Sequence, residues 1–399
     1  MYKFYCRAYQ ETMKVVTYLL NWRKPELLEG ENSVSKLPAV IRSKGIDNVL
    51  VVTDNGITSL GLLDRLLEGL QHEDINYVVY DRTIPNPTIT NIEEALTIYK
   101  QNNCQGIVAF GGGSPMDCAK GVGARVANPK KSIQQMKGQL KVRKEIPSFF
   151  AIPTTAGTGS EATIVAVVSN NDTHEKYAIT DTVLIPHVAV LDPLLTVGLP
   201  PHITSTTGID ALTHAVEAYI GRSNTEETKK FSKEAVTLIF ENLNEAYTNG
   251  TNIEARKNMQ RASYLAGIAF TRAYVGYVHA IAHTLGGFYG IPHGLANAII
   301  LPYVLEYYGT TVHKSLAELS DLISLGTRTN TDAQKATNFI EAIKQLNASM
   351  NIPTKISGIN NTDIPLMVER AMKEANPFYP VPKILSKQDM FQLYQQIKE

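Results

Sequence analysis

The chain of 399 residues is 44% apolar and 19% charged, and its 38 basic residues balance its 38 acidic residues. This is the composition of an ordinary soluble globular protein, and the length exceeds what one hydrophobic core usually serves, so we expect about two domains. Because there is no basic excess, the composition argues against a nucleic-acid-binding protein.

The cysteines and the apolar runs indicate where such a protein resides. Cys6, Cys104 and Cys118 are an odd number without metal-ligand spacing, which favours a reducing compartment. No apolar run approaches 18 residues, so we expect no membrane span. The run 15–20 is short for a signal core and no small-residue cleavage site follows it. The sequence therefore predicts a cytoplasmic protein.

The first half of the chain alternates strand and helix patterns. Residues 1–24 precede the first recognisable element, and the sequence assigns them no role. Continuous apolar runs typical of buried strands occur at 49–53, 77–80, 106–110, 148–152, 162–168 and 188–191. Helical spacing is found between them at 59–70 and 88–101. This alternation predicts right-handed strand-helix-strand units on a parallel sheet.

Beyond Asp192-Pro193 the strand pattern ends. Helices are expected at 208–219, 226–247, 255–270, 295–308 and 332–350. We therefore predict an α/β domain over residues 1–196, with 1–24 as its N-terminal extension, followed by an all-α domain over 197–399.

Two turns at strand ends are candidates for nucleotide binding. In Gly111-Gly112-Gly113-Ser114-Pro115 the glycines let the backbone approach a diphosphate, and the following helix offers free amides, although glycine after a strand is also a common tight turn. The second turn, 153–161, is rich in hydroxyls that can close over a nucleotide; the alternative is a helix N-cap at Thr158 or Ser160. Together the two turns favour a dinucleotide across one edge of the sheet.

Asp54 ends the first buried strand. A carboxylate at this location can accept hydrogen bonds from an adenosine ribose and would repel a 2′-phosphate, which favours NAD over NADP. The alternative is an Asx turn that starts the next segment.

The histidines of the second half form a pattern of their own. Asp210 and His214 are four residues apart, as are His279 and His283, and His293 follows in Pro-His-Gly. Residues four apart share a helix face, so each pair can converge on one point. Imidazoles with one carboxylate suit Fe(II) or Zn(II). A lone histidine on an apolar face is usually a core residue, but packing alone explains this joint pattern poorly, so we predict a metal site.

From about residue 25 to the C-terminus, the chain resembles the iron-containing, group III alcohol dehydrogenases. The resemblance rests on four motifs: Gly-Gly-Gly-Ser-x-x-Asp-x-x-Lys at 111–120, Thr-Thr-Ala-Gly-Thr-Gly-Ser-Glu at 154–161, Gly-x-Asp-Ala-Leu-Thr-His-Ala-x-Glu at 208–217, and His-Ala-x-Ala-His-x-Leu-Gly-Gly-x-x-x-x-Pro-His-Gly at 279–294. It implies a Rossmann-like N-terminal domain, a helical C-terminal domain and an active-site cleft between them.

The resemblance also implies roles for single residues. The implied metal ligands are Asp210, His214, His279 and His293. His283 corresponds to the family's histidine beside the substrate, a catalytic residue and not a principal ligand. The implied nucleotide-binding residues are Asp54, Asn86, Gly112, Gly113, Ser114, Asp117, Thr154, Thr155, Thr158 and Lys176.

One departure concerns the substrate. Family members often carry Asn-Ala-Ser ahead of the metal-binding helix, whereas this chain has Arg272-Ala-Tyr274. If the helix runs unbroken, Arg272 lies on nearly the same face as His279 and can pair with a substrate carboxylate. An ion pair within the helical domain is the alternative, which we favour because Val165, Phe270 and Val275 suggest an apolar pocket for aliphatic alcohols.

These features predict an iron-dependent dehydrogenase that transfers a hydride between NAD(H) and a small primary alcohol or aldehyde, with Zn(II) as an alternative metal. We expect a homodimer or larger homo-oligomer without membrane or nucleic-acid partners. Two alternatives remain: a dehydrogenase of an anionic hydroxy acid or semialdehyde, and a lyase resembling dehydroquinate synthase. The sequence fixes neither the substrate nor the physiological direction.

Overall fold

The computed structural model describes the whole chain except residues 19, 21, 171–174 and 328. The chain forms two compact units, one of residues 21–198 and one of residues 1–20 with 199–399. Assigning residues 1–24 to the α/β domain was therefore wrong for residues 1–20. They form helix α1 (Tyr2–Tyr18), which belongs to the helical unit because it buries Cys6 and Gln10 there.

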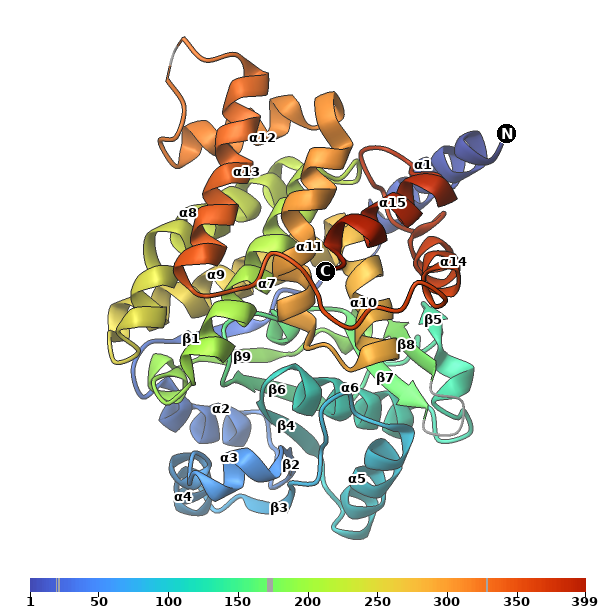
Figure 1. Cartoon of the computed structure of the whole chain (residues 1–399). Coiled ribbons are helices and arrows are strands. Elements are labelled where there is room, and N and C mark those ends of the chain that lie inside the picture. The colour runs from blue at the N-terminus through green and yellow to red at the C-terminus, as the bar shows by residue number, and fades with distance from the viewer. Residues whose placement is uncertain (19, 21, 171–174, 328) are drawn as a thin grey trace. The chain divides into compact units, whose positions relative to one another are not determined.

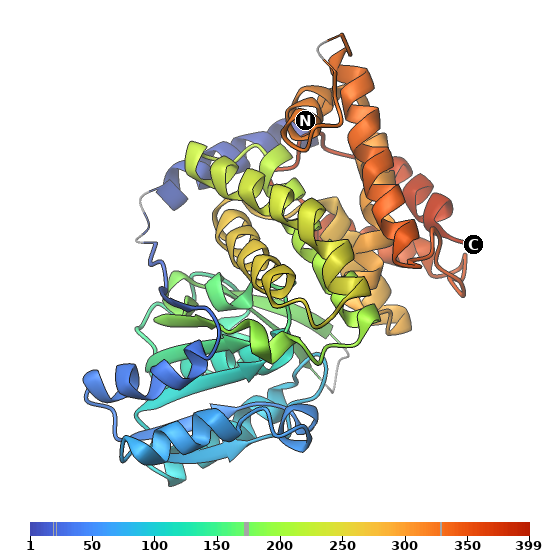
Figure 2. The ribbon, with the colours of Figure 1, turned by 90° about the vertical axis from the view of Figure 1, so that its left-hand side faces the viewer.

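In the described part of the α/β unit, six strands form a parallel sheet in the order β1-β9-β6-β4-β2-β3 (Figure 2). Their bounds are Glu26–Glu29 (β1), Asn48–Val52 (β2), Asn76–Tyr80 (β3), Gly106–Gly111 (β4), Ser148–Pro153 (β6) and Val188–Leu191 (β9). The central strands are apolar on both faces because helices cover both sides, as the sequence predicted.

The two faces of the sheet have separate cores. Leu50 and Val52 pack toward α5 (Ile89–Gln101) and α6 (Gly113–Ala127), whereas Val49 and Val51 pack toward α2 (Leu37–Ser43) and α4 (Asp64–His72) (Figure 1). The chain leaves β2 toward α4 and leaves its neighbour β4 toward α6, on opposite faces. Ligands of open parallel sheets bind at the carboxyl ends of strands at such a switch point.

Some elements differ from the sequence prediction. The helix expected at 59–70 is two helices, α3 (Asn55–Ser59) and α4, because Gly61 adopts a positive φ of 66° between them. A second sheet in the order β5-β8-β7 adds β5 (Gly138–Gln139), β7 (Val165–Asn170) and β8 (Glu175–Thr180), with β7 and β8 antiparallel. The strand expected at 162–168 begins at Val165, since residues 160–162 form a 3₁₀ turn.

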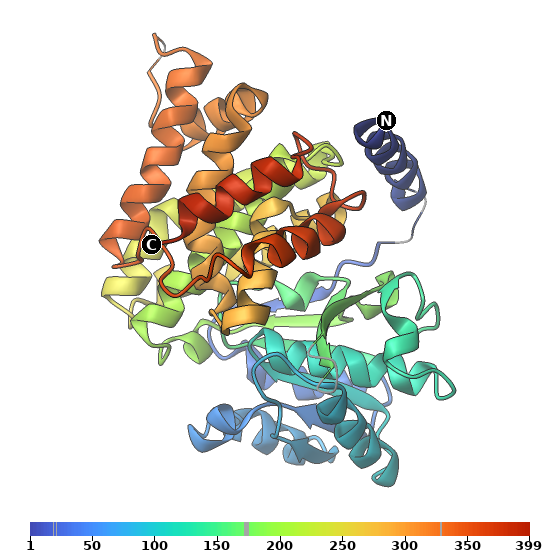
Figure 3. The ribbon, with the colours of Figure 1, turned by 45° about the vertical axis from the view of Figure 1, so that its right-hand side comes forward.

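The helical unit contains the helices that the sequence predicted and several that it did not (Figure 3). Their bounds are Pro201–Ile220 (α7), Glu226–Thr248 (α8), Ile253–Ala273 (α9), Tyr277–Tyr289 (α10), His293–Tyr308 (α11), His313–Leu322 (α12), Asp332–Ser349 (α13), Ile364–Ala375 (α14) and Lys387–Ile397 (α15). Within the described residues, no helix combines the length and the apolar character needed to span a membrane.

Candidate active site

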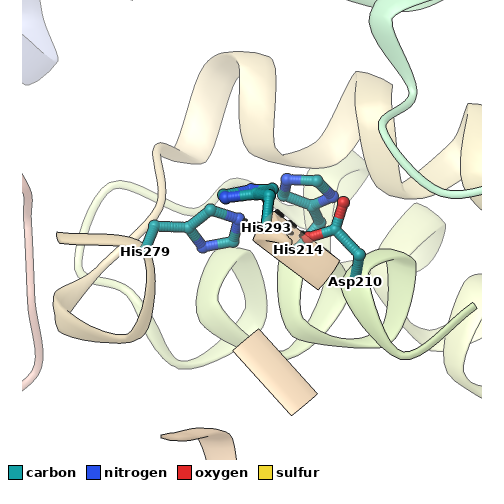
Figure 4. Close-up of side chains that lie close together, drawn as sticks. All are labelled: Asp210, His214, His279 and His293. Carbon is teal, nitrogen blue, oxygen red and sulfur yellow. Dashed lines mark ion pairs between the residues drawn. The ribbon is translucent and has the colours of Figure 1, made fainter. Parts of the chain in front are cut away.

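Three helices of the helical unit bring four metal-binding side chains together. Asp210 and His214 come from successive turns of α7, His279 lies in the first turn of α10, and His293 begins α11. One potential ligand atom from each lies within 4.8 Å of the others, and Figure 4 shows the side chains turned toward one another. The Nε2 atoms of His293 and His279 lie 3.5 and 3.8 Å from Asp210 Oδ1.

A glycine allows α11 to approach α7 this closely. A Cβ on Gly294 would lie 2.4 Å from the carbonyl oxygen of Thr206, which is an impossible contact. Thr206 lies one turn before Asp210 on α7, so this close approach brings His293 to the carboxylate. The glycine of the Pro-His-Gly motif therefore has a packing role beside the metal ligand.

Glu217 orients His279. It lies two turns after Asp210 on α7, is 4% exposed, and its Oε2 accepts a 2.6 Å hydrogen bond from His279 Nδ1. Because a carboxylate only accepts, the proton is on Nδ1 and the lone pair of Nε2 faces the cluster. Burial lowers the pKa of His279, but Glu217 together with the carboxylates of Asp210 and Glu374 outweighs this effect, so the pKa lies above its ordinary value.

The same carboxylate caps α10. The backbone amides of Gly276 and Val278 donate to Glu217 Oε2 and Oε1 at 2.8 and 2.9 Å, which satisfies free donors at the helix start. A Cβ on Gly276 would lie 2.6 Å from Glu217 Oε1, so glycine leaves the space that this contact needs. Glu217 thus fixes both the ring and the backbone of a metal ligand.

Asn297 holds the carboxylate of the cluster. Its Nδ2 donates to Asp210 Oδ1 at 2.6 Å and lies 3.2 and 3.1 Å from the Nε2 atoms of His279 and His293. Burial raises the pKa of Asp210, but the three histidines and the Asn297 amide together hold it below its ordinary value. The carboxylate is thereby kept ionised.

The donor chemistry of these residues fits a divalent transition metal. Three imidazole nitrogens and one carboxylate oxygen form a set that both Fe(II) and Zn(II) accept. The hydrogen bond from His279 to Glu217 is the outer-shell contact that metal-ligating histidines usually make.

His283 lies beside this cluster and is not one of its four members. Its ring stacks on that of His293 at 5.1 Å between centroids, and its Nδ1 is 2.7 Å from Glu374 Oε1 on α14. The side chain is 25% exposed, whereas that of His279 is 3% exposed. The expectation from spacing alone that His279 and His283 converge on one ligand point is thus not met, because Glu374 binds the second ring.

The candidate substrate residues come from both compact units. Phe270 stacks on His214 with ring centroids 4.2 Å apart, so it borders the metal cluster. Val275 precedes Gly276 on the segment between α9 and α10. Val165 starts β7 and belongs to the α/β unit.

Arg272 makes an ion pair within the helical unit. Its Nη1 lies 2.6 Å from Glu227 Oε2 on α8, which is the alternative that the sequence analysis favoured. The premise of an unbroken helix is wrong, because α9 ends at Ala273, Tyr274 has a φ of 66°, and α10 begins only at Tyr277. The heptad spacing between Arg272 and His279 therefore does not place them on one face.

In the α/β unit, the two nucleotide-type turns lie side by side at the carboxyl ends of β4 and β6. Gly111 pairs with Pro153, and the Thr154 amide donates to the Gly111 carbonyl at 3.0 Å. Gly111 has a φ of 146°, and a Cβ on Gly113 would lie 3.0 Å from Thr158 Cγ2. The glycines thus permit a turn that side chains would obstruct.

The other candidate nucleotide residues surround this edge. Asp54 caps α3 by accepting from the Ile57 amide at 3.1 Å, so the Asx-type alternative is correct as local structure; the carboxylate also lies beside Gly111. The backbone amide of Asn86 donates to Ser114 Oγ at 3.2 Å, and the side-chain Oδ1 of Asn86 accepts from Lys176 Nζ at 2.7 Å.

A buried lysine ties the second turn to α6. Lys120 is fully buried, and its Nζ donates to Ser160 Oγ, to the oxygens of Thr163 and to the Val165 carbonyl, at 2.9 to 3.1 Å. Burial lowers the pKa of Lys120. Burial also raises the pKa of the neighbouring Glu161 carboxyl to about 7. Burial likewise raises the pKa of Asp117, whose Oδ1 accepts from Ser160 Oγ at 3.5 Å.

Several of these residues were not predicted from the sequence. Glu217 and Asn297 had a usable signal, since Glu217 follows Asp210 by seven residues and Asn297 follows His293 by four, which places each on the face of a ligand. Glu374 had none, because 91 residues separate it from His283.

A doubly wound parallel sheet with glycine and hydroxyl turns, together with a buried carboxylate and three histidines, defines the class of metal-dependent oxidoreductases. Residues 25–193 match the family model "Iron-containing alcohol dehydrogenase", and residues 204–398 match "Fe-containing alcohol dehydrogenase family, C-terminal". The chain therefore belongs to the iron-containing alcohol dehydrogenase family.

Individual relatives agree with this assignment. The 1,3-propanediol dehydrogenase of Klebsiella pneumoniae is 39% identical over 356 residues, which cover 88% of this chain and 91% of that protein. The NAD-dependent methanol dehydrogenase of Bacillus methanolicus is 33% identical over 371 residues, covering 92% and 97%. A crystal structure of a 1,3-propanediol oxidoreductase superposes with a TM-score of 0.91 at 36% identity, covering 95% and 100%. The protein is thus an alcohol dehydrogenase acting on alcohols or aldehydes, and the lyase alternative is wrong.

Proposed function

We propose that the protein interconverts small primary alcohols and aldehydes with NAD(H), using Fe(II) held by Asp210, His214, His279 and His293. The cluster of four donor atoms within 4.8 Å, three of them on buried residues, carries the proposal. Two relatives add support, since one is a 1,3-propanediol dehydrogenase and the other an NAD-dependent methanol dehydrogenase.

In such a site, a bound metal ion supplies Lewis acidity toward the substrate oxygen. Residues around the ligands fix the orientation and the charge of the side chains that would hold the metal. Glu217 keeps the proton of His279 on Nδ1, and Asn297 holds the Asp210 carboxylate by a 2.6 Å hydrogen bond. The ligand set is therefore largely organised by contacts within the helical unit.

For the nucleotide, we propose that the two turns at the ends of β4 and β6 bind the diphosphate and that Asp54 faces the adenosine ribose. Gly112 and Gly113 start α6, whose first amides are directed at an anion. Ser114, Asp117, Thr154, Thr155 and Thr158 line the same edge, and Asn86 and Lys176 flank it. The carboxylate of Asp54 would repel a 2′-phosphate.

We assign proton transfer to His283. Glu374 accepts from its Nδ1, so the Nε2 atom is the one that can take or give a proton. At 25% exposure the side chain reaches solvent, unlike the buried His279. A histidine beside the ligands that is itself held by a carboxylate suits proton exchange with water.

The second candidate, an anionic hydroxy acid or semialdehyde as substrate, has less support because Arg272 is paired with Glu227. The test compares kcat/KM for a straight-chain alcohol and a hydroxy acid of equal length, in the wild type and in Arg272→Ala. We expect equal, small changes for both substrates. A loss confined to the hydroxy acid would establish that Arg272 binds the substrate anion.

The main experiment measures formation of NADH from NAD and of NADPH from NADP, under anaerobic conditions with added Fe(II), over a panel of C2 to C6 alcohols, diols and hydroxy acids. Metal content per chain is determined on the same preparation, with Zn(II) loading as the parallel arm. Turnover of primary alcohols with one metal per chain supports the proposal. A metal-replete protein inactive on the whole panel would contradict it.

We also propose a cytoplasmic location and assembly as a homodimer or larger homo-oligomer, as predicted from the sequence. Cys6, Cys104 and Cys118 are buried free thiols, which is consistent with a reducing compartment. Sedimentation of the purified protein determines the assembly state.

A further inference from the structure

Helix α1 lies outside both segments that match the family models, residues 25–193 and 204–398. It belongs to the same compact unit as the metal-site helices. Figure 3 shows the segment between α14 and α15 extending toward α1. The residues of α1 that are turned inward are polar as well as apolar, and their partners are specific.

Arg7 and Gln10 lie one turn apart on α1 and bond to one loop, residues 376–382. Arg7 Nη1 and Nη2 donate to the carbonyl oxygens of Val381 and Pro382 at 2.7 and 2.9 Å. Gln10 Nε2 donates to those of Tyr379 and Pro377 at 2.7 and 3.2 Å. Four carbonyl groups of a seven-residue loop are thus satisfied by two side chains of α1.

The contact between α1 and the 376–382 loop is partly buried, and its polar atoms are hydrogen-bonded. Gln10 is only 4% exposed, and its Oε1 accepts from Arg7 Nη1 at 2.8 Å, so both polar atoms of the buried amide are used. Tyr9 adds an edge-on contact with Phe378 at 5.5 Å. Loss of the Gln10 donor would leave the carbonyl groups of Pro377 and Tyr379 without this hydrogen bond, which would destabilise the loop.

Two side chains of the loop form hydrogen bonds with residues next to the active site. Tyr379 Oη donates to Glu374 Oε1 at 2.8 Å, and this same oxygen is 2.7 Å from His283 Nδ1. Asn376 Oδ1 accepts from Tyr277 Oη at 3.1 Å, next to Gly276 at the start of α10. The position of the loop therefore determines how the partner of His283 is held.

We propose that α1 is a positioning element of the active site: through Arg7 and Gln10 it fixes the 376–382 loop, so that Tyr379 holds Glu374 against His283. The kinetic part of this inference rests on the proposed function, in which His283 transfers a proton. The structural part, fixation of the loop, does not. Arg7 and Gln10 act through other residues and touch no reacting group.

The test uses the full-length, metal-loaded enzyme and conservative changes. Gln10→Glu keeps the shape and the acceptor for Arg7 but removes the donor to the loop; Arg7→Lys keeps the charge but loses the two-pronged donor geometry. Tyr379→Phe removes only the link to Glu374. Thr12→Ala is the matched control, because the Thr12 hydroxyl is exposed and, among the described residues, donates to the Ala8 carbonyl within α1 and to nothing in the loop.

The first readout is amide exchange at Asn376, Phe378, Tyr379 and Val381, the residues of this loop that have a backbone N–H, and it needs no substrate. We expect it to accelerate roughly tenfold in Gln10→Glu and less in Arg7→Lys, and to stay unchanged in Thr12→Ala. Unchanged exchange in both Gln10→Glu and Arg7→Lys would overturn the proposal. A failure of the wild type to oxidise any alcohol would refute the proposed function and leave this measurement intact.

The second readout is kinetic. We expect kcat to fall roughly three- to tenfold in Gln10→Glu and in Tyr379→Phe, with nucleotide affinity unchanged. Because both changes act through one hydroxyl, the double variant should be no slower than Tyr379→Phe alone. Losses that multiply in the double variant would show that α1 stabilises the fold without positioning Tyr379, and would overturn the proposal.

Discussion

The two compact units build their candidate sites from different parts of the chain. In the α/β unit, each binding turn is a short segment at the end of one strand, and the parallel sheet places these segments at one edge. In the helical unit, the metal ligands come from three helices. Glu217 holds His279, Asn297 holds Asp210, and Glu374 holds the neighbouring His283, each from a helix other than that of its partner. The comparison shows that backbone-based sites are local in sequence, whereas side-chain clusters depend on long-range packing.

The largest expected effect tests whether the helical unit binds the metal independently of nucleotide binding by the α/β unit. His279→Ala or Asp210→Ala should abolish metal retention and lower turnover by about a thousandfold or more, because a ligand is lost. NAD affinity, measured by fluorescence titration, should stay within a few-fold, since the nucleotide turns belong to the other unit. His202→Ala, an exposed histidine on α7, is the control. Full metal content in either variant would disprove the ligand assignment.

A smaller effect is expected at Glu217, where the contacts are long-range. Glu217→Gln keeps the size but cannot accept at both oxygens, so His279 loses its fixed orientation. Metal affinity should fall roughly 10- to 100-fold in a competition titration with a chelator. Glu234→Gln, which alters an ion pair with Arg261 on the surface of the same unit, should leave affinity unchanged. Equal affinities in wild type and Glu217→Gln would show that the ring is held by packing alone.

In the α/β unit, Glu161 should make stability depend on pH. Burial raises its pKa from 4.5 to about 7. Below pH 4.5 both the folded and the unfolded carboxyl are protonated, and between 4.5 and 7 the unfolded state alone releases its proton. The free energy of unfolding should therefore fall as pH rises through this window, by on the order of 2–3 kcal/mol, and this contribution should stay lost above pH 7.

Urea titrations at pH 5 and pH 8 measure this effect. Glu161→Gln should lose that share of the pH dependence, whereas Glu145→Gln, at an exposed carboxylate, should keep it. A Glu161→Gln variant with the wild-type difference between the two pH values would show that Glu161 is ionised in the fold.

The smallest effect concerns cofactor choice at Asp54. Asp54→Ser removes the charge but retains a side-chain acceptor for the Ile57 amide, whereas Asp54→Gly removes both. Both variants should shift the ratio of kcat/KM for NADP over NAD upward by about tenfold. Thermal stability should fall mainly in the glycine variant. If the ratio is unchanged in both variants, Asp54 caps α3 and does not select the cofactor.

The sequence by itself determined the family, the fold class and most elements of both units. Buried strands and amphipathic helices have periodicities that depend only on local geometry, so β2, β4, α8 and α13 were predicted within one or two residues. The i, i+4 spacing of Asp210 and His214 likewise fixed their common face. The family motifs identified His293 as the fourth ligand, which the structure brings to the cluster although the periodicity did not require it.

The tertiary structure decided what depends on the distance between elements. Spacing placed His279 and His283 on one helix, but only the packing of α11 and α14 shows that His279 joins the cluster while Glu374 holds His283. Local preferences likewise did not reveal the break after Ala273, which Glu217 stabilises from 59 residues away at Gly276. Periodicity specifies the face of a helix, whereas the approach of two helices depends on side-chain volumes and hydrogen bonds from distant parts of the chain.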